Sequence, residues 1–432
     1  MEPLESLFRP RSVAVVGASR NPKKLGHVIL KNILEGGFEG DIIPVNPKAD
    51  EILGLKAYDI DSMPRTDTAV ISIPAKYVPE AIEKLGKKGV KSAIVISSGF
   101  AEVGNVDLQR SLVKAARKHG MRVLGPNCAG LINAFHKYYP TFEVRVKPGK
   151  AAFVTQSGAL GGAVLMELYS LDKGLGVFVS YGNAADVNEA DLIEYLKERE
   201  ELDAIAFYIE GLHEGRRFVE ALKGAKNVYV LKGGKTEAGS KAASSHTASL
   251  SGDRAMFRSI VGAYARILND TRELFLAIDA MNYGLKRVRR VAILTNSGGP
   301  GVLAADELDK LGLELPDLSS YDRSFLPPFA SRRNPIDMAA GADYDVIYKS
   351  MKVLNEAPEV DGILFIFVPP IHIPAENAVK AIIDAEPKKP VVAVLMGGSF
   401  VKNARVMLEK HGIPVVSHPE DGAKLISLGL SP

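Results

Sequence analysis

The chain has 432 residues, of which 46% are hydrophobic and 24% charged, and its formal net charge is +3. This length exceeds what a single hydrophobic core usually holds, so we expect two or three domains in a globular protein and exclude a disordered chain. The small net charge, without a long Lys/Arg block, argues against nucleic-acid binding, and the one cysteine excludes an intrachain disulfide and fits a reducing compartment.

Neither the N-terminal sequence nor the apolar runs of the chain suggest export or membrane insertion. The N-terminal sequence lacks the apolar region of a secretory signal. No apolar run of about 18 residues is free of charges or turn residues, so we expect no membrane span. The expected location is the cytoplasm.

Short β-branched runs alternate with helical patterns along the first part of the chain. This alternation predicts βαβ units and a parallel sheet. The predicted strands are Ser12–Val16, Asp41–Val45, Thr68–Ile73, Ser92–Ser97 and Arg122–Leu124, and the predicted helices are Lys24–Glu35, Tyr77–Lys87 and Asp107–His119.

Two further sets of strands and helices follow with the same rhythm. The second has strands Ala151–Thr155, Gly176–Ser180, Ala204–Tyr208 and Asn227–Lys232, with helices Gly158–Ser170, Glu189–Glu198 and Arg216–Lys223; the third has strands Arg290–Thr295, Gly362–Phe367, Pro390–Met396 and Pro414–Val416. We therefore predict an α/β protein with three doubly wound domains, covering residues 1–133, 134–285 and 286–432.

The end of the first predicted strand indicates a phosphate-binding turn. Gly17 and Ser19 follow the strand, and Lys23 and Lys24 precede the next helix. A glycine here lets backbone amides approach an anion, and the helix N-terminus carries a partial positive charge. The spacing is not G-x-G-x-x-G, and an ordinary structural turn is the alternative.

The end of the second strand argues against NAD. A fold that binds NAD places Asp or Glu near this position for the ribose, whereas this chain has Val45, Asn46, Pro47 and Lys48. The lysine favours a phosphorylated nucleotide, and a simple Asn-Pro turn is the alternative.

Polar or turn residues also end the next three strands. They are Pro74, the run Ser97-Ser98-Gly99 and the run Gly125-Pro126-Asn127. Because the carboxyl ends of parallel strands share one edge, where open α/β sheets bind ligands, these tips predict a cleft. Any single tip could be only a loop.

A second strand-to-helix turn lies at Thr155-Gln156-Ser157-Gly158, with Gly161 one turn later. Unpaired N–H groups and the helix dipole would make it an anion site. An ordinary serine N-cap is the alternative.

His246 lies in a polar loop of small residues, Ser244–Gly252. A neutral imidazole is a competent nucleophile near pH 7. Glu210 ends a strand of the same predicted sheet, where its carboxylate could hold one imidazole nitrogen. The alternatives are a solvent-facing histidine and a loop-anchoring glutamate. No zinc-ligand spacing or G-x-x-x-x-G-K-[ST] loop is present, so we expect no metal ligands.

Taken together, the motifs resemble the α-subunit of ADP-forming acetyl-CoA and acyl-CoA synthetases, relatives of the succinyl-CoA synthetase α-subunit. The resemblance covers essentially the whole chain. It is carried by VVGAS (15–19), PVNPK (44–48), ISSGFAE (96–102), GPNCAG (125–130), TQSGALG (155–161), GNAADVNEADLIEYL (182–196), YIEG (208–211), SSHTASLSG (244–252), TNSGGPG (295–301) and NPIDM (334–338).

The resemblance implies a Rossmann-like CoA-binding domain followed by two flavodoxin-like domains. It implies that His246 is phosphorylated in turnover and that Glu210 supports the phosphohistidine. The positions implied to hold phosphate are Gln156, Ser157, Gly158 and Gly161. The positions expected to hold CoA, including the first glycine turn, are Gly17, Ser19, Lys24, Val45, Asn46, Pro47, Lys48, Pro74, Ser97, Ser98 and Asn127.

The resemblance also implies a partner, because no ATP-grasp domain is recognisable in this chain. The partner would be an ATP-grasp β-subunit that holds ADP or ATP with Mg²⁺, in an α2β2 assembly. The implied reaction interconverts acyl-CoA, ADP and phosphate with a small organic acid, CoA and ATP. The sequence indicates neither which acid is used nor whether ADP or GDP is preferred.

Two other readings remain open at this point. One is a catalytically inactive protein that binds CoA or acyl-CoA for regulation, against which the intact His246, Glu210 and Gln156–Gly161 turn argue. The other is a nicotinamide oxidoreductase, disfavoured by the missing acidic residue after the second strand and the missing G-x-G-x-x-G motif.

Overall fold

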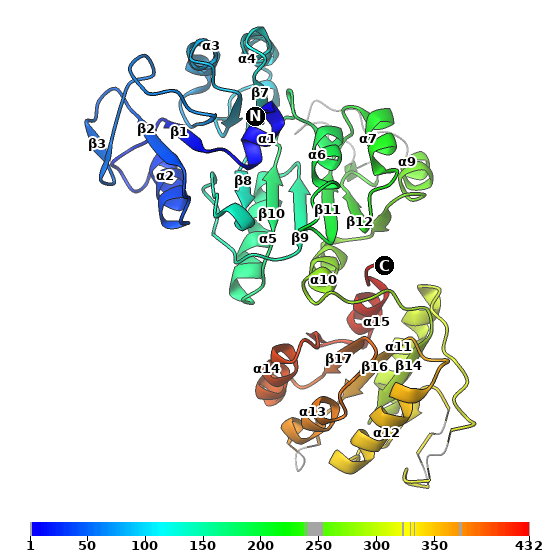
Figure 1. Ribbon diagram of the computed structural model, residues 1–432. Helices are drawn as coiled ribbons and strands as arrows, with labels where there is room; N and C mark the ends of the chain where they lie inside the picture. Colours follow the sequence, from blue (N-terminus) through cyan, green and yellow to red (C-terminus); the bar gives the residue numbers. More distant parts are fainter. Residues whose placement is uncertain are drawn as a thin grey trace. The chain divides into compact units, whose positions relative to one another are not determined.

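The computed structural model describes residues 2–236, 238–239, 254–321, 324–328, 330–331, 333–370 and 374–431. The chain divides into two compact units, Met1–Thr271 and Arg272–Pro432. The first unit contains two large sheets and the second contains one (Figure 1). The predicted α/β class is thereby confirmed.

The first sheet has five parallel strands in the order β2-β1-β5-β6-β7. Alternate residues of β1, which lies between β2 and β5, face opposite layers, as the pleat requires. Val13 and Val15 pack in the same cluster as the buried face of α2, whereas Ala14 and Val16 pack with α3 and α4. The strands are β1 (Ser12–Val16), β2 (Asp41–Val45), β5 (Thr68–Ile71), β6 (Ser92–Val95) and β7 (Arg122–Leu124).

The helices of this layer follow the expected amphipathic spacing. In α3, the buried residues Val78, Ala81, Ile82 and Leu85 recur at intervals of three and four. Their bounds are α1 (Pro3–Phe8), α2 (Leu25–Glu35), α3 (Val78–Lys87) and α4 (Val106–Lys118), with short turns η1 (Ala75–Tyr77) and η2 (Ala101–Val103) and a small hairpin of β3 (Glu51–Ile52) and β4 (Leu55–Lys56).

The second sheet has six strands in the order β13-β12-β11-β9-β10-β8. All its pairs are parallel except β8 with β10. The predicted first domain extends to residue 133, but β8 pairs in this second sheet. Its strands are β8 (Gly130–Asn133), β9 (Ala151–Thr155), β10 (Val177–Ser180), β11 (Ala204–Ile209), β12 (Val228–Lys232) and β13 (Arg266–Leu268), and its other elements are η3 (Ala134–His136), α5 (Gly158–Ser170), α6 (Glu189–Leu196), α7 (Gly215–Leu222) and α9 (Arg254–Val261).

The first two sheets share one apolar core. Leu7 and Phe8 of α1 belong to the same buried cluster as Val177 and Val179 of β10. The ring of Phe8 stacks on Tyr195 of α6 with 4.2 Å between centroids. This shared core fixes the two sheets within one compact unit.

The third sheet, in the second unit, has five parallel strands in the order β15-β14-β16-β17-β18. Its central strand, β16, is buried along its whole length. The elements are α10 (Thr271–Asn282), β14 (Val291–Thr295), α11 (Gly298–Lys310), β15 (Ile336–Asp337), α12 (Tyr344–Glu356), β16 (Gly362–Phe367), α13 (Ala375–Asp384), β17 (Val391–Leu395), η4 (Gly398–Val401), α14 (Lys402–Lys410), β18 (Val415–Val416) and α15 (Pro419–Ser427).

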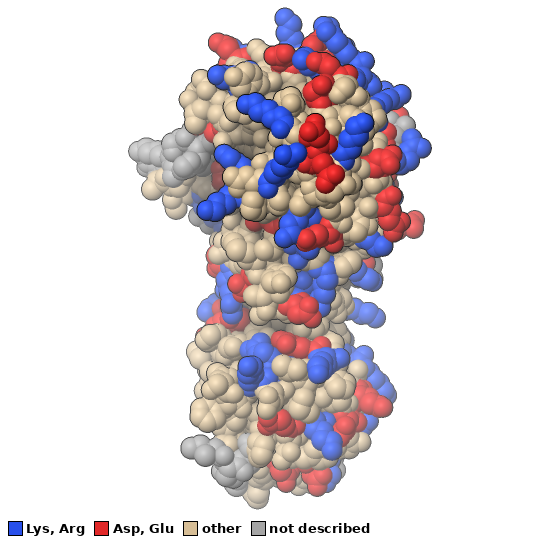
Figure 2. All heavy atoms as spheres, turned by 90° about the vertical axis from the view of Figure 1, so that its left-hand side faces the viewer, with Lys and Arg blue, Asp and Glu red and all other residues tan. Residues whose placement is uncertain are grey.

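Charged side chains of both signs are interspersed over the face of the molecule shown in Figure 2. Ion pairs between such side chains occur along the described chain, for example between Lys84 and Asp61 at 3.0 Å. That face therefore carries no broad single-sign patch of the kind that binds nucleic acid. Among the described residues, no helix combines the length and the apolar character that crossing a bilayer requires.

Candidate active site

The turn after β1 brings the N-terminus of α2 close to the strand tip. Gly17 has φ +94°, and a Cβ there would lie 2.3 Å from the carbonyl oxygen of Ser72. A Cβ on Gly26, in the first turn of α2, would lie 1.9 Å from the carbonyl oxygen of Gly17. Only glycines allow this approach of helix to strand, which leaves backbone amides accessible to an anion. Ser19 lies in this turn and its Oγ accepts a bond from the Asn21 amide at 3.1 Å.

The tip of β2 is fastened to the tip of β1 by Asn46. Its Nδ2 donates to the Ala18 carbonyl at 2.8 Å, and its Oδ1 accepts from the Lys48 amide at 2.9 Å. The backbone of Val45 accepts from the Gly17 amide at 3.0 Å. Asn46 therefore shapes this edge, while the exposed Lys48 side chain remains available for a phosphate.

The tips of β5, β6 and β7 are also joined. Ser97 Oγ donates to the Ile73 carbonyl at 2.6 Å, and the Asn127 amide donates to the Ser97 carbonyl at 2.9 Å. Pro74 and Ser98 are exposed beside them. The residues predicted to hold CoA thus lie along one sheet edge, at a strand tip or at the start of α2: Gly17, Ser19, Lys24, Val45, Asn46, Pro47, Lys48, Pro74, Ser97, Ser98 and Asn127.

The second predicted anion site lies where β9 turns into α5. Ser157 caps the helix, its Oγ accepting from the Leu160 amide at 3.3 Å. Thr155 Oγ1 donates to the Ser157 carbonyl at 2.8 Å and fixes the turn. Gly158 opens the helix, and Gly161 leaves no side chain where a Cβ would lie 2.7 Å from the Phe178 ring. The first turn of α5 is thereby held against the sheet with amides at its open end.

Gln156 supplies an unused hydrogen-bond donor in this turn. Its Oε1 accepts from the amides of Glu210 and Gly211 at 2.8 and 3.2 Å. Among the described residues its Nε2 has no partner, although Gln156 is only 4% exposed. A buried donor without a partner is uncommon, and an ordered water or a bound anion could satisfy it. A phosphate oxygen at the adjacent helix N-terminus would satisfy it.

Glu210 follows β11 directly and lies beside Gln156. The Tyr208 hydroxyl donates to its Oε1 at 3.4 Å, and Lys232 Nζ donates to its carbonyl oxygen at 2.6 Å. Burial, with a smaller effect from the Glu210 charge, raises the pKa of Tyr208 to about 12, so this hydroxyl stays a donor. Burial also lowers the pKa of Lys232. Gln156 and Lys232 thus fix the backbone of Glu210, and its carboxylate accepts one bond, from Tyr208.

The CoA edge and the phosphate turn are neighbours within the first unit. The Ala129 amide, just beyond the β7 tip, donates to Ser180 Oγ at 3.0 Å. A Cβ on Gly158 would lie 3.4 Å from the Ala129 Cβ. The chain just beyond the β7 tip therefore lies against the N-terminus of α5.

His246, predicted as the phosphorylated residue, lies outside the described residues, as does its motif Ser244–Gly252. On the N-terminal side of this motif, the described chain includes Lys232 and Gly233 at the end of β12. They pair with Ile209, the residue before Glu210. The structure therefore gives no geometry for the histidine itself.

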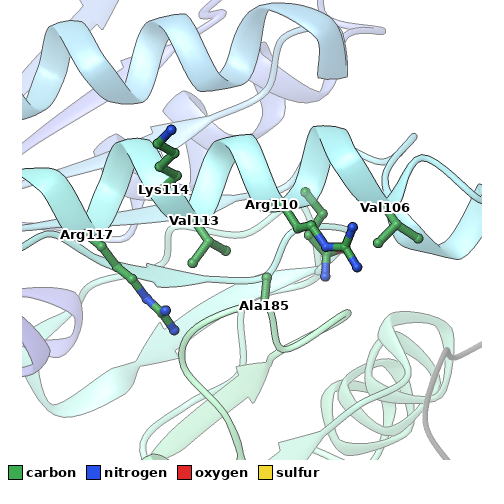
Figure 3. Close-up of a pocket in the computed structure, with 7 residues that line it drawn as sticks. Val106, Arg110, Val113, Lys114, Arg117 and Ala185 are labelled. Atoms are coloured by element: carbon green, nitrogen blue, oxygen red, sulfur yellow. The ribbon is translucent and has the colours of Figure 1, made fainter.

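Two residues that the sequence did not single out join these sites. Glu102 accepts from the Gly99 amide at 2.5 Å, and Asn183 donates to Glu102 at 2.6 Å. Both belong to motifs that carried the family resemblance, but nothing in the sequence showed that they meet. A groove of about 610 Å³ lies next to them, and no residue predicted to bind CoA or phosphate lines it (Figure 3).

Comparison with known proteins identifies the family to which the chain is similar. Three family models match in order: a CoA binding domain at 11–134, a succinyl-CoA ligase like flavodoxin domain at 148–281 and a ligase-CoA domain at 291–427. The acetate–CoA ligase [ADP-forming] II subunit alpha of Pyrococcus furiosus is 41% identical over 97% of this chain and 96% of its own length.

A longer relative and a solved structure agree with this match. The acetate–CoA ligase [ADP-forming] I of Archaeoglobus fulgidus is 38% identical over 98% of this chain, which spans 63% of that protein. The dinucleotide forming acetyl-coenzyme A synthetase 1 of Ca. Korarchaeum cryptofilum, solved with phosphate and ADP, superimposes with a TM-score of 0.93 at 36% identity, covering 99% of this chain and 96% of that one. The chain belongs to the family of α-subunits of ADP-forming acetate–CoA ligases.

Proposed function

We propose that this chain is the CoA-binding and phosphoryl-carrying subunit of an ADP-forming acyl-CoA synthetase. With an ATP-grasp subunit it would interconvert acyl-CoA, ADP and phosphate with a carboxylic acid, CoA and ATP. The names of its relatives make acetate the first acid to test.

The observation that carries the proposal is the unpartnered Nε2 of Gln156. It is a buried donor at the open N-terminus of α5, which lies next to the tip of β7, and the oxygen of the same side chain accepts from the Glu210 amide. An anion is the ligand that such a donor and helix end select. CoA bound at the proposed sheet edge, beside phosphate bound at the proposed anion site, would meet the requirement for phosphorolysis of a thioester.

The first chemical step would take place at this turn. A phosphate oxygen attacks the thioester carbonyl, the C–S bond breaks, and CoA leaves as the thiolate and takes up a proton. The product is an acyl phosphate. The amides of Ser157 and Gly158 and the Gln156 Nε2 would donate to phosphate oxygens, which orients the nucleophile and stabilises charge on it.

The second step would transfer the phosphoryl group to His246. An imidazole nitrogen attacks phosphorus, the P–O bond to the acyl group breaks, and the carboxylate is released. Glu210 would hold the other imidazole nitrogen and stabilise the cationic phosphohistidine. ADP bound to the partner would then accept the phosphoryl group and become ATP.

The partner is part of the proposal. The family resemblance points to an ATP-grasp β-subunit that binds the nucleotide with Mg²⁺, in an α2β2 assembly. The Archaeoglobus relative supports this, because this protein spans only 63% of the single chain there, which leaves length for a further domain. The proposed ADP and Mg²⁺ contacts therefore lie mainly on the partner.

Reconstitution tests the function directly. The chain is mixed with its ATP-grasp partner, and ATP formation from acetyl-CoA, ADP and phosphate is measured. We expect ATP to form only when all three substrates and both subunits are present, and not with His246→Ala. CoA binding should persist in that variant. ATP formation at the wild-type rate by His246→Ala would remove the phosphoryl-carrier role.

A further inference from the structure

The side chain of Asn183 connects the two halves of the candidate active site. It lies in the segment between β10 and α6, within the second sheet's layer. Its Nδ2 donates to Glu102 Oε2 at 2.6 Å and to Gln109 Oε1 at 3.0 Å. Its Oδ1 accepts from Asn127 Nδ2 at 3.3 Å. Because a carboxylate only accepts, the orientation of the Asn183 amide is determined.

Glu102 in turn holds the loop that follows β6. Its Oε1 accepts from the amides of Gly99 and Phe100 at 2.5 and 3.1 Å. Burial opposes its ionisation, but hydrogen bonds from Asn183 and Gly99 outweigh burial and lower the pKa of Glu102. The ionised carboxylate thus fixes the backbone next to Ser97 and Ser98, two of the predicted CoA contacts.

The backbone of the same segment is bonded to the tip of β7. The amides of Asn183 and Ala185 donate to the carbonyls of Pro126 and Gly125 at 2.9 and 3.0 Å. Gly182 has φ +51°, and a Cβ there would lie 2.2 Å from the Asn127 carbonyl oxygen. The segment therefore follows the CoA edge closely on one side.

On its other side the segment adjoins the phosphate turn. The amide of Tyr181, two residues before Asn183, donates to the Thr155 carbonyl at 3.0 Å. One short stretch of chain therefore contacts both the loops of the CoA edge and the strand that carries Gln156.

We propose that Asn183 is a positioning residue for CoA, which holds the loops at Glu102 and Asn127 in register with the phosphate turn. The inference rests on the proposed function, since it concerns how the CoA edge is presented to the anion site. Asn183 itself contacts neither substrate in this account. It acts by fixing the backbone beside Ser97 and the side chain of Asn127.

The charged groups around Asn183 are few and defined. Glu102 faces it directly, and Asp186 of its own segment pairs with Arg122 at 2.9 Å. Arg110 lines the groove with Gln109 and Ala185, and pairs with Asp107 at 3.0 Å. Figure 3 shows Arg117 directed toward the segment that carries Ala185, Arg110 extending along α4 toward Val106, and Lys114 directed away from that segment. An acid introduced at position 183 would therefore interact first with Glu102.

The test uses two variants in the reconstituted α/β complex. Asn183→Ala removes all the side-chain bonds, and Asn183→Asp places a second carboxylate beside Glu102. We expect the Kd for CoA, measured by titration calorimetry at pH 8, to rise about tenfold or more in both, as loss of a charged hydrogen bond implies. The rate at which MgATP phosphorylates the α-subunit without CoA should stay within about threefold of wild type, because no phosphate contact changes.

The pH profile separates positioning from a general packing defect. Like charges raise the pKa of a carboxyl pair, so Asn183→Asp and Glu102 should share a proton at low pH and bond again. CoA affinity of Asn183→Asp should then recover to within about threefold of wild type near pH 5.5, whereas Asn183→Ala stays weak at both pH values. Asn377→Asp, an exposed change on α13, is the matched control and should behave as wild type.

Two results would overturn the inference. One is unchanged CoA affinity in both Asn183 variants while the wild-type complex binds CoA. The other is a parallel loss of CoA binding and phosphorylation at every pH, which would reflect general damage to the fold. Failure of the wild-type complex to bind CoA at all would instead refute the proposed function.

Discussion

The turn between β9 and α5 in the second sheet and the turn between β14 and α11 in the third sheet are built alike. Thr155 Oγ1 donates to the Ser157 carbonyl at 2.8 Å, and Thr295 Oγ1 donates to the Ser297 carbonyl at 2.9 Å. In both turns the next side chain is an amide, whose oxygen accepts from the tip of a neighbouring strand.

The two amides differ in what their nitrogen does. Gln156 accepts from the Glu210 amide with its oxygen and leaves Nε2 unpartnered. Asn296 accepts from the Val368 amide at 2.9 Å and donates its Nδ2 to the Val368 carbonyl at 2.8 Å. The shorter side chain closes on one strand tip, whereas the longer one keeps a donor for a ligand.

The residues around the N-termini of α5 and α11 also favour an anion only at α5. At the tip of the neighbouring strand, the second sheet has Glu210 and the third has Val368. A Cβ on Gly298, which opens α11, would lie 3.1 Å from Asp337 Oδ2, whereas the group nearest Gly158 is the Ala129 methyl. The third sheet thus supplies its own carboxylate to the helix N-terminus, where the second would accept phosphate. In the proposed account, one backbone arrangement would serve structure in the third sheet and phosphate binding in the second.

Gln156→Glu should have the largest effect on the difference between the two turns. It keeps an oxygen for the Glu210 amide but replaces the unpartnered donor with a negative charge that repels phosphate. We expect kcat/KM for ATP formation from acetyl-CoA, ADP and phosphate to fall about 100-fold or more, as for loss of an oxyanion donor. Asn296→Asp is the matched change in the third sheet and should leave kcat/KM unchanged. Equal losses in the two variants would contradict the assignment.

Glu210→Gln should have the next largest effect. The neutral amide keeps the size of the side chain but no longer stabilises a cationic phosphohistidine, so we expect the phosphorylated fraction at equilibrium with MgATP to fall about tenfold. Val368→Gln, at the corresponding strand tip, should not alter phosphorylation. Labelling of Glu210→Gln at the wild-type level would exclude Glu210 from the mechanism.

Asp337→Asn tests whether the corresponding turn in the third sheet contributes to stability alone. It removes the charge at the N-terminus of α11 and should lower the free energy of unfolding by about 0.5–1 kcal/mol, measured by urea denaturation, without changing kcat. Asp309→Asn, near the C-terminal end of the same helix, should be neutral or slightly stabilising. A drop in kcat for Asp337→Asn would indicate that the third sheet takes part in catalysis.

The smallest expected effect concerns Cys128, next to the β7 tip. Its thiol is buried and donates to the Val95 carbonyl at 3.3 Å, and burial raises its pKa from 9.0 to about 12. It should resist alkylation at pH 8 in the native protein and react only after unfolding. Because the folded-state pKa is the higher one, its contribution to stability is complete below pH 9 and is lost as the pH rises toward 12. Rapid alkylation of the native protein would show that the β7 tip opens readily.

Sequence periodicity was enough to predict most of the long buried strands of the three sheets, because each carries its own pattern, but it did not predict helices α1 and α9 or strand β13. β1 and β9 begin and end where they were predicted. It did not predict β8, a four-residue strand whose antiparallel pairing with β10 depends on a partner more than forty positions away. Nor did it predict β15, which is two residues long.

The candidate site divides in the same way. Strand-tip residues such as Gly17 and Ser157 could be selected because parallel strands bring their carboxyl ends to one edge. The sequence could not show that Asn46 uses both of its amide atoms within the fold, that Gln156 leaves one free, or that Asn183 meets Glu102. These hydrogen bonds depend on which side chains meet after folding, and local sequence patterns do not predict such tertiary contacts.

The most direct test of the account asks where the phosphoryl group is held. The chain is incubated with its ATP-grasp partner and MgATP, and its intact mass is measured, followed by mapping of the modified peptide. The account predicts one acid-labile phosphoryl group, on His246 of the second domain, absent in His246→Ala and strongly reduced in Glu210→Gln. A phosphoryl group that persists in His246→Ala, or that maps to the third domain, would contradict it.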